Sequence, residues 1–184
     1  HEVAERPAPS KEFTPEWFRR MDSYDRSAEN PDGKKLLVRN RTSNASAKKC
    51  TPMLDAIQGG YTIPLWADVQ VTGTPGQMPR IDWRVSGNVF SEHGPSAKKI
   101  PQPPGYGNTV FKYLPHFKIV TPPGYSILVK PVAGHYDLPF VPVSAIIDTD
   151  KVKIDTNFPV WVKDGFDGVV EKGTPIAQVF PFKR

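Results

Sequence analysis

The order of apolar and polar residues predicts a mainly β protein. From Lys112 onward, short runs rich in Val, Ile and Phe alternate with Pro and Gly about every eight to twelve residues, a spacing typical of β-sandwiches and β-barrels. Upstream, residues 81–90 (IDWRVSGNVF) alternate between apolar and polar side chains, and this period of two predicts one half-buried strand. Residues 61–73 (YTIPLWADVQVTG) predict a further strand, interrupted at Pro64.

Two short helices are predicted in the first third of the chain. A Thr-Pro pair opens each of them, since Thr suits the capping position and Pro suits the first helical turn. The first helix is expected over about residues 15–21 and the second over about 52–58, before a Gly-Gly pair. We therefore expect residues 1–60 to form an N-terminal arm with two short helices, packed on a β domain that spans residues 61–184.

The composition supports this fold class and narrows the expected partners. Of the 184 residues, 21 are proline and they are spread along the chain, a density that long helices do not tolerate. The net charge is +5, but the basic pairs are scattered, so a nucleic-acid surface is not expected. No apolar stretch is long enough for a transmembrane helix or a signal peptide, so no membrane association is expected.

Residues 121–180 contain an ordered set of motifs: PPGYSILVKP, AIIDTD, KVKIDTNFPVWV and GVVEKGTPIAQVF. This set resembles the trimeric dUTPase and dCTP deaminase family, whose members have the β-clip fold. The resemblance implies a dUTPase-like β-clip barrel or sandwich over residues 112–182. It also implies a nucleotide site in which Asp148 orients the attacking water, Gln178 contacts the phosphates, and the ligand is bordered by Gly134, Asp150 and Lys151.

The residues expected to hold the phosphates depart from the family pattern. The phosphate segment reads Pro-Val-Ala-Gly at 131–134, so the family's arginine and serine donors are absent. Lys151 stands near the position of the tyrosine that closes over the base in the family, and Pro175 removes a backbone donor. Phosphoryl chemistry depends mainly on positioning and charge stabilisation. We therefore predict a protein without a working active site and without a cofactor.

Longer motifs spread over the whole chain carry a second resemblance. PEWFRRM, KKCTPMLDAIQGGYTIPLWADV, TPPGYS, NFPVWV and GTPIAQVFPFKR are similar to an uncharacterised family of tailed phages and some bacteria. This family has no established activity, and our first hypothesis is a phage virion protein, either a capsid decoration (cement) protein or a tail-associated accessory. The expected partners are capsid or tail proteins, and the expected assembly is a homotrimer. The expected location is the virion, or the cytoplasm if the protein is not encoded by a phage.

An enzymatic alternative is a divergent nucleotide enzyme of the dUTPase or dCTP deaminase type that keeps Asp148 and Gln178. Such an enzyme would need replacement cations, and Lys130, Lys151 and Lys153 are near in sequence. The competing interpretation of Asp148-Thr149-Asp150 is an ordinary turn, in which the carboxylates accept backbone N–H bonds and close a hairpin.

A third alternative is a metal-dependent oxygenase. His135 and Asp137 have a spacing that places two ligands on one face of a strand. Either His93 or His116 would have to complete a set of two histidines and one carboxylate. The test of this alternative is whether the fold brings these side chains together.

Overall fold

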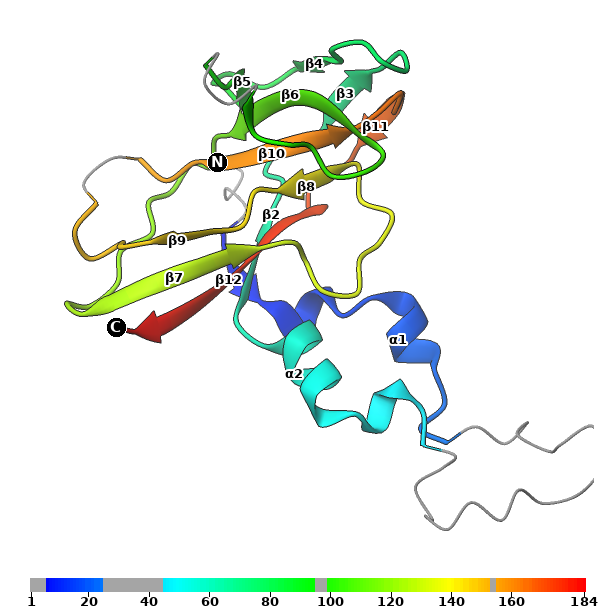
Figure 1. Ribbon diagram of the computed structural model, residues 1–184, viewed down its shortest axis with the longest axis vertical. Coiled ribbons are helices and arrows are strands. Elements are labelled where there is room, and N and C mark those ends of the chain that lie inside the picture. Colours follow the sequence, from blue (N-terminus) through cyan, green and yellow to red (C-terminus); the bar gives the residue numbers. More distant parts are fainter. Residues whose placement is uncertain (1–5, 25–44, 95–98, 153–154) are drawn as a thin grey trace, which may run out of the picture.

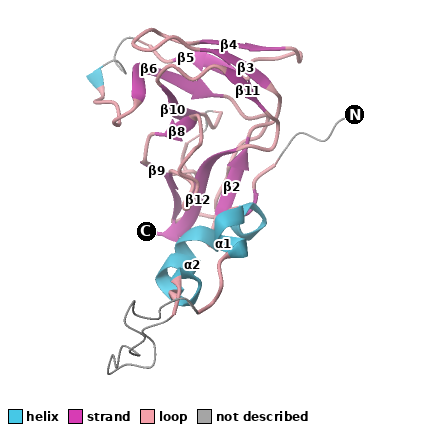
Figure 2. Cartoon of the chain, turned by 90° about the vertical axis from the view of Figure 1, so that its right-hand side faces the viewer, coloured by secondary structure: helices cyan, strands magenta, loops and turns pink. Residues whose placement is uncertain are grey.

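The computed structural model describes residues 6–24, 45–94, 99–152 and 155–184 of the chain. Within them the chain is mainly β, with three antiparallel sheets and few helices, so the predicted mainly β class is confirmed. The smallest sheet lies at one end of the molecule, and the helices lie at the other end, beside the largest sheet (Figures 1 and 2).

The largest sheet has five strands in the order β1-β2-β12-β7-β9. These strands are β1 (Ala8–Pro9), β2 (Tyr61–Pro64), β12 (Pro175–Lys183), β7 (Tyr125–Lys130) and β9 (Ala145–Ile147). The second sheet has the order β5-β6-β10-β8, with β5 (Phe90–Glu92), β6 (Tyr106–Tyr113), β10 (Phe158–Lys163) and β8 (Phe140–Pro142). The third sheet has the order β11-β3-β4, with β11 (Gly168–Val170), β3 (Val69–Thr72) and β4 (Arg80–Trp83).

In the described residues before β2, the chain forms two α-helices and two 3-10 helices. They are η1 (Ser10–Phe13), α1 (Glu16–Arg20), η2 (Ala47–Lys49) and α2 (Thr51–Gln58). The α-helices occur where the Thr-Pro pairs predict them, but neither threonine caps its helix. Thr14 instead donates its hydroxyl hydrogen to the carbonyl of Lys11 at 2.7 Å, which closes η1. The N-cap positions belong to Pro15 and Cys50.

One apolar core joins the three sheets. It includes buried side chains from each sheet, among them Ile63, Ile127 and Val179, then Phe90, Tyr113 and Val160, then Val69, Val71 and Val170. In β3 the alternation is strict, since Val69 and Val71 are buried while Gln70 and Thr72 are exposed. Burial of apolar surface contributes about 25 cal/mol per Å², so this core fixes one face of each sheet. The other face of the three-stranded sheet carries polar side chains into solvent.

The N-terminal segment is attached to the five-stranded sheet by strand pairing and by side chains. Residues Ala8–Pro9 pair antiparallel with β2. The Ser10 and Thr62 hydroxyls form a buried hydrogen bond at 3.0 Å. Phe18 of α1 and Ile57 of α2 are almost fully buried, so the helices are anchored by apolar contacts as well.

Two predicted strands are each divided by a turn. The 81–90 segment forms β4 and β5 with a turn between them, because Gly87 has a φ of +104° and its carbonyl accepts a bond from the indole N–H of Trp83. The 61–73 segment forms β2 and β3. Between them, Leu65 leaves the strand and exchanges backbone bonds with residues 173 and 174.

Candidate functional site at the Asp148–Asp150 turn

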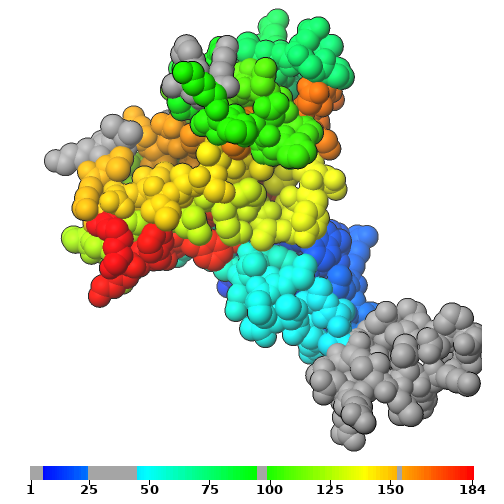
Figure 3. Space-filling model, in the orientation of Figure 1, coloured from blue at the N-terminus to red at the C-terminus, as the bar shows by residue number. Residues whose placement is uncertain are grey.

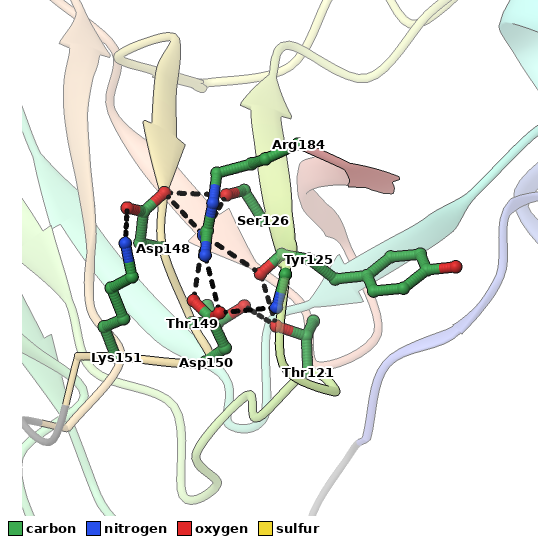
Figure 4. Close-up of polar contacts among 9 residues, drawn as sticks. Thr121, Tyr125, Ser126, Asp148, Thr149, Asp150, Lys151 and Arg184 are labelled. Carbon is green, nitrogen blue, oxygen red and sulfur yellow. Dashed lines mark hydrogen bonds and ion pairs between the residues drawn. The ribbon is translucent and has the colours of Figure 1, made fainter.

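The Asp148–Asp150 segment is a turn that directly follows β9. The Thr149 amide donates to the carbonyl of Ile147, and the Lys151 and Val152 amides both donate to the carbonyl of Asp148, each at 2.9 Å. The turn places both carboxylates beside the start of β7 and the end of β12 (Figure 4). The segment is therefore a turn, as the sequence predicts, but the turn does not close a hairpin, because β9 and β10 belong to different sheets.

Asp150 is held by Arg184 and by the backbone of the loop before β7. The Arg184 guanidinium forms two bonds to its carboxylate, at 2.8 and 2.6 Å, and the Gly124 amide donates a third at 2.8 Å. The Arg184 hydrogen bonds are the largest cause of a pKa for Asp150 lowered from 3.8 to about 2. Desolvation opposes this shift, since only 7% of the Asp150 side chain is exposed. The carboxylate is therefore ionised and fully engaged.

Asp148 shares the same arginine. Its Oδ1 accepts a hydrogen bond from the buried Ser126 hydroxyl at 2.7 Å and lies 3.0 Å from Arg184 Nη1, while its Oδ2 lies 3.7 Å from Lys151 Nζ. The Ser126 bond is the largest cause of a lowered pKa for Asp148. Ser126 in turn accepts from Arg184 at 2.8 Å, so the three side chains form a closed network.

Two threonines extend the network into the protein. The Thr121 hydroxyl donates to the Tyr125 carbonyl at 2.9 Å, and it lies 2.7 Å from the buried Thr149 hydroxyl. A hydroxyl has one hydrogen to donate, so Thr149 must be the donor in the second bond. Each hydroxyl hydrogen thus has an acceptor within the chain.

Gln178 lies on β12 and is fully buried. Its Nε2 donates to the carbonyls of Ala56 and Gly59 at 3.0 and 2.7 Å, at the end of α2. Its Oε1 accepts from Lys130 Nζ at 2.7 Å and from the Ala133 amide at 3.2 Å. These four bonds use the whole hydrogen-bonding capacity of the amide.

Asp148 and Gln178 do not converge on one site. In the β12–β7 register, Gln178 lies opposite Lys130, whereas Phe182 lies opposite Ser126, the partner of Asp148. Four residues along a strand separate these levels by about 13 Å. A small apolar hollow of about 210 Å³ adjoins the turn, and its walls include Ile147 and Thr149 but neither Asp148 nor Gln178.

Gly134 packs against the N-terminal helices. It is buried with a φ of +80°, and an added Cβ would lie 3.0 Å from Pro15 Cγ. Its carbonyl accepts a bond from the Trp17 indole at 2.7 Å. Lys130, at the other end of this loop, has a pKa lowered by burial. The segment predicted to contact phosphates therefore contacts α1 and α2 instead.

The side chains proposed for a metal are also separated. The His135 ring nitrogen Nε2 lies 2.6 Å from the Phe13 carbonyl, and Asp137 is exposed. Within residues 6–24, 45–94, 99–152 and 155–184, no group of three His, Cys, Asp or Glu side chains could hold a metal ion. His93 and His116 therefore do not complete the set that the oxygenase alternative requires.

Arg184 is the residue of this site that sequence reasoning missed. No local pattern marks it, because its partners are 34 and 36 residues earlier in the chain, at Asp150 and Asp148. The comparisons with known proteins add no assignment: no family model, no curated protein and no solved structure matches the chain. Among the described helices, none is long and apolar enough to cross a membrane.

Proposed function

We propose that this protein is a non-enzymatic structural or interaction protein. The observation that carries the proposal is that Asp148, Asp150 and Gln178 are all bonded within the chain. A water-activating carboxylate needs an oxygen directed at the water. Here Asp148 Oδ1 has two donors of its own, and Oδ2 faces Lys151.

Two described cations that a nucleotide site could use are also occupied, whereas Lys153 lies outside the described residues. Arg184 is divided between two carboxylates, and Lys130 donates to Gln178. A phosphate cradle needs preorganised donors that are free to contact the ligand. These side chains instead connect β7, β9, β12 and α2, which is a stabilising role.

The more specific form of the proposal is a tailed-phage virion component, a capsid decoration protein or a tail-associated accessory, with a dUTPase-like β-clip fold and a homotrimeric assembly. It is supported by the two sequence resemblances. It is compatible with exposed apolar side chains at separate places on the surface, including Val120, Tyr136 and Ile146, which are 65–74% exposed. Single exposed apolar side chains are common on soluble proteins, so these residues do not by themselves mark an interface.

The test is a calorimetric titration of the purified protein with a non-hydrolysable dUTP analogue and Mg²⁺, with the mass measured by light scattering on the same sample. We expect no binding heat and the mass of a trimer. Micromolar binding that is lost in Asp148→Asn, but kept in the exposed control Asp167→Asn, would overturn the proposal in favour of a nucleotide enzyme. A monomeric mass would refute the trimer.

A further inference from the structure

The exposed face of the three-stranded sheet forms a hollow that none of the sequence motifs indicated. The hollow has a volume of about 670 Å³, which is within the range of roughly 300–1,000 Å³ typical of small-molecule sites. It lies at the end of the molecule opposite the helices, where β3 and β4 appear in green and β11 in orange (Figure 3). The Asp148–Asp150 turn belongs to the five-stranded sheet, so this hollow is a separate feature.

The strand register explains which side chains line the hollow. Val169, Gln70 and Asp82 lie directly opposite one another across β11, β3 and β4, so their side chains share one face. Thr72 and Arg80 form the next row on this face. The opposite face carries the valines of the core, so the polar row is held in place by a rigid apolar layer.

Charged groups of both signs surround the hollow. Arg80 Nε bonds to the Asp82 carboxylate at 2.7 to 2.9 Å, and Asp68 Oδ1 accepts from the Lys172 amide at 2.7 Å. Arg84 has no hydrogen bond or ion pair with any residue that the structure describes. Two arginines and two aspartates line the hollow, so its formal charge is zero.

Much of the hydrogen-bonding capacity of these side chains is unused. Gln70 donates one amide hydrogen to the Val71 carbonyl at 3.1 Å, and its Oε1 accepts no hydrogen bond from the described residues. Arg84 has its five guanidinium hydrogens available, and Arg80 uses only Nε in the bond to Asp82. Donors and acceptors therefore lie side by side, next to the exposed apolar side chains of Val85 and Val169.

We propose that this hollow binds a neutral saccharide. Each sugar hydroxyl both donates and accepts, so a polyol matches a surface where arginine donors alternate with carboxylate and amide acceptors. The C–H groups of a sugar ring would contact Val85 and Val169. Charge-assisted hydrogen bonds that Arg84 donates and Asp82 accepts would supply most of the affinity.

Other ligand classes fit this hollow less well. An anion would meet Asp68 and Asp82, and a cation would meet Arg80 and Arg84, because opposite charges stand beside each potential partner. An apolar ligand would remove the unpaired Arg84 from water without offering it an acceptor. A neutral ligand rich in hydroxyl groups avoids both penalties.

The experiment is a titration of the ¹⁵N-labelled chain followed by two-dimensional NMR. The probes are glucose, galactose, mannose and N-acetylglucosamine, together with maltotriose, cellotriose and chitotriose. Each is added up to about 20 mM, so that a Kd as weak as about 1 mM is detected. We expect at least one probe to shift the amide signals of Gln70, Asp82 and Val169 while the signal of Asp148 stays in place.

Two variants decide whether the predicted side chains carry the binding. Arg84→Ala and Asp82→Asn should each weaken it about tenfold, the loss expected for one charge-assisted hydrogen bond. The surface controls Arg20→Ala and Asp167→Asn should bind like the wild type. An unchanged amide spectrum outside the hollow shows that each variant is folded.

Three results would overturn the saccharide site. The first is that none of the seven probes shifts any amide signal. The second is that the shifted signals lie away from the hollow, or that the shifts persist in both variants. The third is that inorganic phosphate or spermidine causes equal shifts. Failure of the saccharide site would leave the nucleotide titration unaffected, because that experiment concerns residues of the five-stranded sheet.

Discussion

The substitution Gln178→Leu tests whether this glutamine stabilises the fold or serves a ligand. Leucine has a similar volume and suits a fully buried position, but it removes all four hydrogen bonds of the amide. The carbonyls of Ala56 and Gly59 would lose a donor, and Lys130 and the Ala133 amide would lose an acceptor. The contact between α2 and β12 would weaken as a result.

The number of hydrogen bonds lost in Gln178→Leu sets the expected decrease in the free energy of unfolding. A buried hydrogen bond contributes about 0.5–1.5 kcal/mol net, so four bonds correspond to about 2–6 kcal/mol. The partner groups lie in partly exposed residues, and water can replace some of the lost bonds. We therefore expect a loss of about 2–4 kcal/mol in the free energy of unfolding, in the lower half of that range. For a chain of this length, the melting temperature should fall by about 5–15 °C.

Urea unfolding followed by circular dichroism measures this difference, and a thermal scan gives the change in melting temperature. Gln77→Leu is the matched control, because Gln77 is exposed and should change stability by less than about 0.5 kcal/mol. A Gln178→Leu protein as stable as the wild type would refute the structural role. Residues selected for ligand binding are often replaced without loss of stability, or with a gain, so that result would favour the nucleotide enzyme.

Three further variants, two of them with a matched control variant, test other parts of the structure. Asp150→Asn should remove an acid-sensitive contribution to stability. The folded pKa of Asp150, about 2, lies below the ordinary 3.8, so this contribution is complete above about pH 4 and is lost as the pH falls towards 2. It should be absent when the stability of the variant is measured against pH. Gly134→Ala combines a φ of +80° with a Cβ 3.0 Å from a proline ring carbon and should cost about 2–4 kcal/mol in urea unfolding. Gly105→Ala, with the same backbone strain at φ +81° but no atom within 4 Å, should cost only about 1 kcal/mol. Tyr113→Phe removes a buried bond of 2.7 Å to a backbone carbonyl and should cost about 1–3 kcal/mol in a thermal melt, whereas the exposed Tyr61→Phe should have no measurable effect.

The fold class could be predicted from local patterns, because period-two alternation and proline density act over a few residues. The same patterns could not place the turn at 84–89, since the alternation of IDWRVSGNVF continues through it and only the backbone at Gly87 changes. Gln178 was assigned to a phosphate on resemblance alone. Its actual partners at 56, 59, 130 and 133 are brought to it by strand and helix packing, which no motif encodes.

Asp150 and Asp82 differ in how much of each carboxylate can contact a ligand, and this difference separates a supporting residue from a candidate ligand residue. Asp150 accepts three hydrogen bonds of 2.6 to 2.8 Å and is 7% exposed, so little of its carboxylate can meet a ligand. Asp82 is 46% exposed, and its one partner among the described residues is Arg80, which is itself 78% exposed. A bound ligand must offer more than the contacts it displaces, and it displaces far less at Asp82 than at Asp150. Recognition chemistry is therefore expected at the three-stranded sheet, while the Asp148–Asp150 turn stabilises the five-stranded sheet.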